Sequence, residues 1–253
     1  YRYYPPPDSF LSRQPGWLRR VLFSSFWVVI LVAASSLFYL PFTEKFGQAY
    51  GTISVWKDGH SPLGSYLVHW GWQLFLIVSW FVWETREWLA ATPASAIKKI
   101  KPYLAYIQVV SLLFVLVLVL LTALDIRIGW VVGILGVWAA VLMVRPDQKD
   151  KKRFVLFMIG TGLVLTLFVE LFALEGDIGR MNTVFKFYYQ AWTLLNLSAA
   201  AALLWLVPEV TNRWKSGIAS VWQAVLVLLL AGAFLYPVTA SMDKIRDRMS
   251  ESA

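Results

Sequence analysis

Seven apolar stretches, each close to the length of a membrane-spanning helix, constrain the fold of this chain more than any motif does. They cover residues 17–40, 63–88, 103–124, 128–144, 154–174, 183–207 and 217–236. A helix of about 20 residues crosses the hydrocarbon core of a bilayer. Because lipid offers no hydrogen-bond partners, a crossing segment has to satisfy its own backbone, as a helix does. The sequence therefore predicts an all-α fold, a polytopic transmembrane helical bundle of about seven spanning helices that forms a single domain over residues 1–253.

The composition agrees with a multi-pass membrane protein and excludes several kinds of site. Hydrophobic residues make up 58% of the chain and charged residues only 15%, with a mean hydropathy of +0.60, which is typical of membrane proteins. The chain has no cysteine, which excludes disulfides, thiolate metal ligands and cysteine nucleophiles. Its two histidines, His60 and His69, are too few for a metal centre built from imidazoles.

The basic residues predict how the chain is oriented in the membrane. If the amino terminus of the chain is cytoplasmic, 15 of the 23 lysines and arginines lie on the cytoplasmic side, as the positive-inside rule requires. A loop at 41–62, a polar bend at 174–182 and a tail at 237–253 then lie on the exoplasmic side. We attribute the net charge of +8 to this arrangement and to contact with membrane lipids, and we expect no nucleic-acid partner.

Charged and polar residues are concentrated between two of the apolar stretches, in the segment ELFALEGDIGRMNTVFKFYYQAW at 170–192. Gly176 and Gly179 interrupt the helical pattern there and favour a sharp bend. Glu170 precedes the bend and Lys186 follows it, so a helix hairpin brings the two charges to a similar depth on neighbouring helices. Since an unpaired charge at that depth is costly, we predict a structural ion pair between Glu170 and Lys186.

The bend also carries the candidate functional residues. Glu175 and Asp177 lie two positions apart and can share a divalent cation, Mg²⁺ or Mn²⁺, so they are the candidate catalytic and metal-binding residues. A cation together with arginine and lysine would neutralise the phosphate of a ligand. The candidate substrate-binding residues are therefore Arg180, Asn182, Lys186, Tyr188 and Tyr189. The alternative is a polar bend with a purely structural role.

The exoplasmic loop is too short to form a domain. It contains Asp58 and His60, either of which could act as an acid or a base if the loop covers the bend. The alternative is that both residues are solvated on the surface of the loop.

Four segments of the chain resemble the YYY family of prokaryotic multi-pass membrane proteins. The most specific of them is GDIGRMNTVFKFYYQAWTLL at 176–195. The others are LPF at 40–42, YGTISVWKDGHSPLGSYL at 50–67 and YPVTASMDKIRDRMSE at 236–251. Members of that family are longer, so the resemblance implies that this chain is an internal portion of a longer protein.

The YYY family is in turn similar to the GT-C class of polytopic glycosyltransferases. That similarity implies, by analogy, transfer of a sugar from a polyprenyl-phosphate carrier to an acceptor on the exoplasmic face. Glu175 and Asp177 would then orient a metal ion or the acceptor, and Arg180 and Lys186 would hold the carrier phosphate. Asn182, Tyr188 and Tyr189 would line the path of the lipid-linked sugar. The chain departs from the GT-C pattern in one respect, because its acidic pair lies in a late loop rather than near the first spanning helix.

Two other functions are compatible with the same residues. The chain could be a non-enzymatic accessory subunit that packs against partner membrane subunits, or a transporter with Glu170 and Lys186 on its substrate path. An enzyme predicts that the polar residues of the bend face a cavity. A structural subunit predicts that they pair with one another or with a partner chain.

Overall fold

The computed structural model describes residues 16–45, 52–96, 101–174 and 179–249. The chain divides into two compact units, residues 1–51 and residues 52–253. In the first unit the structure describes one helix, α1 (Gly16–Lys45), which is 30 residues long and contains Pro41. None of its apolar window is buried within the structure, as expected for a helix whose side chains face lipid.

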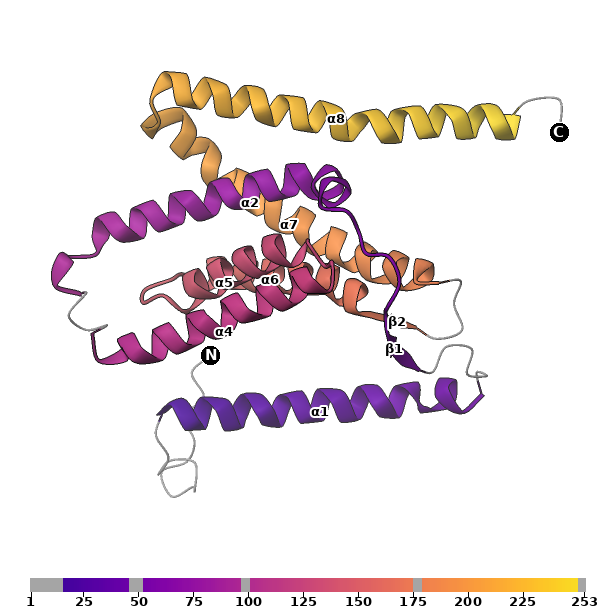
Figure 1. Cartoon of the computed structure of the whole chain (residues 1–253), viewed down its shortest axis with the longest axis horizontal. Helices are drawn as coiled ribbons and strands as arrows, with labels where there is room; N and C mark the ends of the chain where they lie inside the picture. Colours follow the sequence, from indigo (N-terminus) through magenta and orange to yellow (C-terminus); the bar gives the residue numbers. More distant parts are fainter. Residues whose placement is uncertain (1–15, 46–51, 97–100, 175–178, 250–253) are drawn as a thin grey trace. The chain divides into compact units, whose positions relative to one another are not determined.

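The second unit is a helical bundle (Figure 1). Its helices are α2 (Leu63–Ala91), α4 (Leu104–Ala123), α5 (Gly129–Val144), α6 (Asp150–Leu171), α7 (Met181–Arg213) and α8 (Ser216–Met249). Short 3₁₀ turns lie at η2 (Ala94–Ala96) and η3 (Lys101–Tyr103), and two strands are present, β1 (Ile53–Val55) and β2 (Phe172–Leu174). The predicted all-α fold is therefore confirmed, with one α-helix for each of the seven apolar stretches among the described residues.

Fewer helices than seven qualify as spans by their length and apolarity. Five described segments do, in α1, α4, α6, α7 and α8. Helix α5 is apolar but only 16 residues long. The hydropathy of α2 is lowered by His69, Gln73 and Glu84, which interrupt its apolar and aromatic residues. The predicted count of about seven is thus approximate, while the polytopic helical class holds.

The small β-ladder was not expected from the apolar pattern. Strand β1 pairs antiparallel with β2, with Ile53 opposite Leu174 and Val55 opposite Phe172. The Trp56 N–H donates to the Leu171 carbonyl at 2.9 Å, at the last residue of α6. The apolar stretch predicted as helix up to residue 174 therefore ends as helix at Leu171, because its last residues pair with the preceding loop instead.

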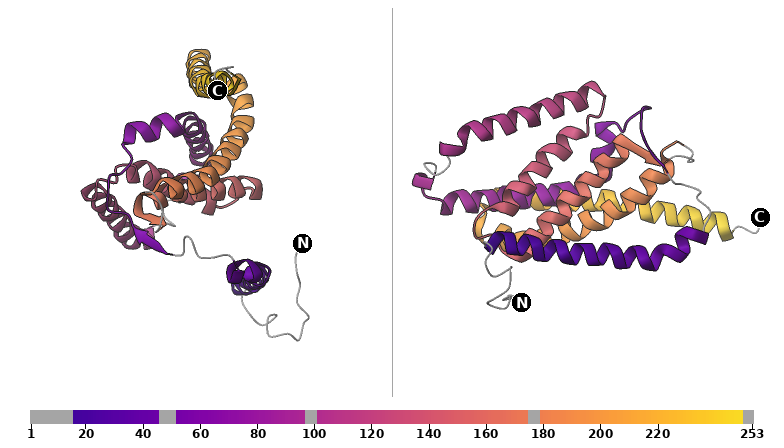
Figure 2. Two further views of the ribbon diagram at one scale, coloured as in Figure 1. Left: turned by 90° about the vertical axis from the view of Figure 1, so that its right-hand side faces the viewer. Right: turned by 90° about the horizontal axis from the view of Figure 1, so that it is seen from below.

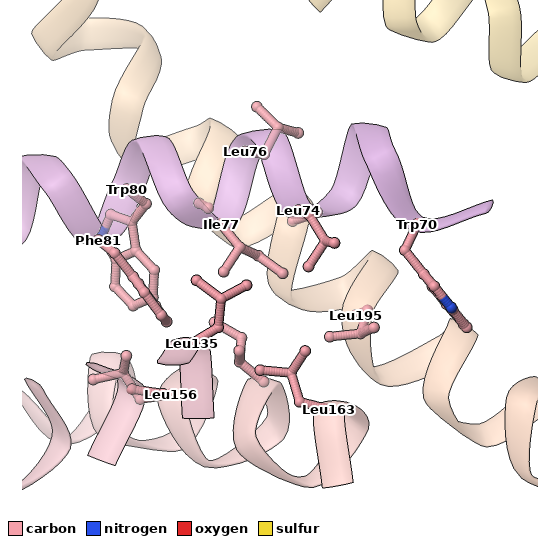
Figure 3. Close-up of a cluster of buried hydrophobic side chains, with 14 of the residues drawn as sticks. Trp70, Leu74, Leu76, Ile77, Trp80, Phe81, Leu135, Leu156, Leu163 and Leu195 are labelled. Atoms are coloured by element: carbon pink, nitrogen blue, oxygen red, sulfur yellow. The ribbon is translucent and has the colours of Figure 1, made fainter. Parts of the chain in front are cut away.

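The core lies where α6 packs against both α5 and α7, and where α2 packs against α7 and α5. Figure 2 gives two further views of this bundle. Figure 3 shows the central cluster, in which Ile77 and Phe81 of α2 lie close to side chains of the other three helices. The side chains from those helices are Leu135 of α5, Leu156 and Leu163 of α6, and Leu195 of α7.

Small residues set the spacing between α6 and α7. A Cβ atom built on Gly162 would lie only 2.9 Å from Cγ of Leu195, and Ala191, Ala199 and Ala202 are fully buried on the facing stripe of α7. Lipid supplies no hydrophobic driving force between helices, so their association depends on such close packing. This contact fixes the position of α6 relative to α7.

Candidate functional site

The site is organised around Glu170, in the last turn of α6. Its side chain is 0% exposed. Ser61 donates to both carboxylate oxygens, through its hydroxyl to Oε1 at 2.6 Å and through its backbone N–H to Oε2 at 2.9 Å. Arg180 Nη1 lies 2.9 Å from Oε2. A buried carboxylate is stable only when its charge is paired and its lone pairs are filled, and these contacts meet both conditions.

Arg180 directly precedes α7 and links three parts of the site. Besides Glu170, its guanidinium donates to the Val169 carbonyl at 2.9 Å and to the Ser61 hydroxyl at 3.2 Å. It also lies over the Trp56 ring, 5.5 Å from the centroid. The preceding Gly179 has a φ of +61°, in the left-handed region that favours glycine. The predicted role of Gly179 in the bend thus agrees with its backbone conformation.

His60 is the second group that faces the carboxylate. Its Nδ1 lies 3.3 Å from Glu170 Oε2, off the direction of a hydrogen bond, and has no hydrogen-bond partner in the described part of the chain. The side chain is 11% exposed. The nearby negative charge attracts a proton on Nδ1, so it favours the tautomer protonated on Nδ1 over the one protonated on Nε2.

The loop that carries these residues packs against Glu170 and Arg180, the described residues on the two sides of positions 175–178. His60 and Ser61 pack onto Glu170, and Trp56 packs onto Arg180. Asp58, by contrast, is exposed. Of the two candidate acid–base residues in the loop, the structure brings only His60 to the buried site.

A shell of aromatic and hydroxyl side chains surrounds the carboxylate. The Tyr66 hydroxyl lies 3.0 Å from Thr166 Oγ1, one turn before Glu170 on α6. The Tyr188 hydroxyl lies near Ser61, close to the charges of Glu170 and Arg180. The Tyr188 and Trp70 rings meet edge to face, with centroids 5.3 Å apart.

An apolar groove of about 400 Å³ lies beside this cluster on α7 and α2. Its lining consists of His69, Met181, Val184, Phe185, Tyr188, Tyr189 and Trp192. Tyr188 belongs both to the groove and to the polar cluster. Two of the predicted substrate-binding residues, Tyr188 and Tyr189, therefore line one groove.

The other predicted site residues are placed as follows. Glu175 and Asp177 lie outside the described residues, so their catalytic and metal-binding roles stay predictions. Asn182 is half-buried and Lys186 is exposed on the first turns of α7. The role of Lys186 as a phosphate ligand and that of Asn182 on the path of the lipid-linked sugar also stay predictions. Within the described ranges, no group of three or more histidine or acidic side chains is arranged to hold a metal ion.

Glu170 forms an ion pair that the sequence analysis did not predict. The structure pairs Glu170 with Arg180, immediately before α7. Lys186 lies six positions further along, which is about 9 Å along a helix axis, so the pair between Glu170 and Lys186 stays a prediction. Arg180, expected to hold a phosphate, directs donors at Glu170, Ser61 and Val169 instead.

Sequence reasoning missed Ser61 and Thr166. Ser61 is 109 positions from Glu170 in the chain, and no periodic pattern relates two residues at that distance. The only available signal was the YGTISVWKDGHSPLGSYL segment, which contains Trp56, His60, Ser61 and Tyr66.

The fold and the site together define a polytopic helical membrane protein with a buried, charge-paired polar cluster at one end of its bundle. A family model described as uncharacterized membrane protein (DUF2298) matches residues 4–195. The chain belongs to this family. The matched region contains the whole cluster from Trp56 to Tyr188 and ends within α7. No curated protein and no solved structure matches the chain.

Proposed function

We propose that this protein binds a polyprenyl-phosphate-linked sugar on the exoplasmic face and transfers the sugar to an acceptor, in the manner of the GT-C glycosyltransferases that the YYY family resembles. The single observation that carries the proposal is the position of Tyr188. Its ring lines an apolar groove and its hydroxyl lies near the charges of Glu170 and Arg180. An amphiphilic ligand needs this combination, because its hydrocarbon chain and its polar head must be recognised side by side.

Each polar residue has a role in this proposal. The groove takes the first isoprene units, with Tyr189 and Trp192 against the chain. Lys186 and Asn182, on the first turns of α7, hold the carrier phosphate. Glu175 and Asp177 orient the acceptor or a divalent cation. Arg180 acts through Glu170, whose charge it balances at 2.9 Å.

His60 is the base of the proposed reaction. In this proposal the Glu170 carboxylate, 3.3 Å from Nδ1, favours a proton on that nitrogen, and Nε2 accepts the proton of the acceptor. The acceptor hydroxyl oxygen attacks the anomeric carbon of the sugar, and its proton passes to Nε2. The bond from the anomeric carbon to the phosphate oxygen breaks, and its electron pair leaves with the polyprenyl phosphate.

A second candidate function is favoured by a different observation. Arg180 pairs with Glu170 inside the chain, which is what a structural polar bend predicts. In this alternative the protein is a non-enzymatic accessory subunit of a larger membrane assembly, and the cluster fastens the β1–α2 loop to the α6–α7 hairpin.

Binding of a radiolabelled polyprenyl-phosphate sugar to the protein in nanodiscs, with and without Mg²⁺, separates these functions. The informative variant is Tyr188→Phe, which keeps the ring in the groove and removes the hydroxyl from the cluster. Its matched control is Tyr106→Phe on α4, where the ring is 72% exposed and lies outside the groove. We expect saturable binding by the wild type and the control, and about tenfold weaker binding by Tyr188→Phe, as for loss of one hydrogen bond near a charge.

Two further variants locate the phosphate. Lys186→Gln is expected to lower the affinity for the lipid-linked sugar both with and without Mg²⁺. Asp177→Asn is expected to abolish only the increase in affinity that Mg²⁺ causes. Absence of binding by a folded wild type across several lipid-linked sugars would overturn the transferase proposal and favour the accessory subunit.

A further inference from the structure

A second buried carboxylate, Glu84, lies near the other end of α2 from Ser61. Its side chain is 4% exposed and is held by two cations. Arg145 Nη2 lies 2.8 Å from Oε2, and Lys152 Nζ contacts Oε1. The Trp80 indole N–H also donates to Oε1, at 3.3 Å. The Glu84 cluster therefore joins α2 to the end of α5 and the first turn of α6.

An open cleft of about 650 Å³ borders this cluster. The start of α6 contributes Lys149, Lys151 and Lys152 to its wall, and α2 and α7 contribute the indoles of Trp83 and Trp205. Unlike the groove beside Tyr188, whose lining is almost wholly apolar, this cleft has a wall of mixed polarity. It suits a ligand that has both a charged and an apolar part.

The charges around the cleft leave a positive excess. Its three acids are all compensated: Glu84 by Arg145 and Lys152, Asp150 by Arg153 at 3.6 Å, and Glu209 by Arg213 at 3.1 Å. Across the part of the chain that the structure describes, Lys149 and Lys151 form no ion pair, and both are exposed. Two ammonium groups at the cleft are thus available to an anion from outside the chain.

The indoles indicate where that anion comes from. Tryptophan is enriched at the level of lipid headgroups, and basic pockets between spanning helices bind phosphate-bearing headgroups. In the orientation that the basic residues predict, the start of α6 lies on the cytoplasmic side, where anionic lipids are concentrated. The favoured ligand is therefore a lipid phosphate rather than a soluble anion.

We propose that this cleft binds the headgroup of an anionic phospholipid, with the phosphate between Lys149 and Lys151 and the glycerol backbone against Trp83 and Trp205. The Glu84 cluster keeps the start of α6 at a fixed distance from α2, and so holds the cleft open for the lipid. The site is separate from the Glu170 cluster and is independent of the glycosyl-transfer proposal.

Native mass spectrometry of the purified protein, titrated with phosphatidylglycerol or phosphatidylcholine, tests this site. The variant is the double substitution Lys149→Gln and Lys151→Gln. The matched control is Lys101→Gln with Lys215→Gln, two exposed lysines that do not line the cleft. We expect the cleft variant to bind phosphatidylglycerol about thirtyfold more weakly than the wild type, from the loss of two lysine contacts, and the control to differ by less than about threefold.

Three results would overturn the proposal. The first is an unchanged affinity of the cleft variant, and the second is an equal loss in the control, which would show a general charge effect. The third is displacement of the lipid by millimolar inorganic phosphate, which would assign the cleft to a free anion. All four substituted lysines are exposed, so the variants are expected to fold, and an unchanged unfolding midpoint checks this.

Discussion

Glu84 and Glu170 are both buried carboxylates, one near each end of α2, but they are held in different ways. The partners of Glu84 are long side chains from helix ends, Arg145 after α5 and Lys152 in the first turn of α6. Glu170 is held by one cation, Arg180, and by the short loop before α2, through Ser61 and His60. A carboxylate with two cations and only helical partners is a rigid fastening. One held by a single cation and by a loop that carries an imidazole has a group beside it that can transfer a proton, as acid–base chemistry requires.

The largest expected effect on stability comes from removing the one cation that Glu170 has, compared with one of the two cations of Glu84. Arg180→Met leaves Glu170 buried with no cation other than a protonated His60, so we expect a loss of about 3–5 kcal/mol in the free energy of unfolding. Arg145→Met leaves Lys152 on Glu84, and we expect a loss of about 1–3 kcal/mol, mainly from the hydrogen bonds to the charged group. Thermal unfolding of both variants in the same detergent measures the difference.

Equal losses of unfolding free energy in Arg180→Met and Arg145→Met would show that the number of cations does not distinguish the Glu170 cluster from the Glu84 cluster. The double substitution Glu170→Met with Arg180→Met serves as a control, because it removes the buried charge together with its partner. It is expected to recover most of the stability that Arg180→Met loses.

The next largest effect on stability tests whether the loop before α2 holds the Glu170 carboxylate. Ser61→Ala removes the hydroxyl that donates to Glu170 at 2.6 Å and accepts from Arg180 at 3.2 Å. We expect it to cost about 1.5–3 kcal/mol, as for a hydrogen bond to a charged group. The matched control is Thr85→Ala, which removes a neutral acceptor of the Trp138 indole N–H at 2.8 Å, at an expected cost of about 0.5–1.5 kcal/mol. Chemical denaturation in mixed micelles compares them, and a smaller loss for Ser61→Ala would show that the loop does not hold the carboxylate.

The smallest effect on stability, but the most specific, concerns His60. We expect its neutral imidazole to carry the proton on Nδ1, facing Glu170 at 3.3 Å. The long-range ¹⁵N–¹H spectrum of histidine-labelled protein distinguishes the two tautomers, and the variant His69→Gln leaves His60 as the one histidine of the chain. Glu170→Gln should lessen the preference for the Nδ1 proton. A dominant Nε2–H tautomer in His69→Gln would exclude His60 as the proposed base.

Much of the fold could be predicted from the apolar pattern. Each predicted apolar stretch contains an α-helix. The short gap between the stretches at 103–124 and 128–144 is the turn that joins α4 to α5, with Asp125 at a φ of 58° and paired with Arg127. Helix ends were less predictable. The end of α6 at Leu171 is set by pairing with β1, from a loop more than a hundred positions earlier, and no local pattern carries that information.

The candidate site was predictable in its place but not in its contacts. The glycines and charges of the bend identify where polar groups gather, and burial of Glu170 was expected. Its pairing with Arg180 was not, because that contact depends on where α7 begins. Likewise, His60 and Asp58 are two positions apart in one loop, yet only His60 reaches Glu170.

By itself the sequence determined that this protein is an all-α, polytopic membrane protein with a polar bend between two apolar helices, since long apolar runs have few solutions in lipid. Only the tertiary structure decided which charges meet. Ser61, His60 and Arg180 converge on Glu170 because the packing of α6 on α7 and the pairing of β1 with β2 bring distant segments together. A buried charge pairs with the residue that the packing places within hydrogen-bonding distance, and the folded backbone decides which residue that is.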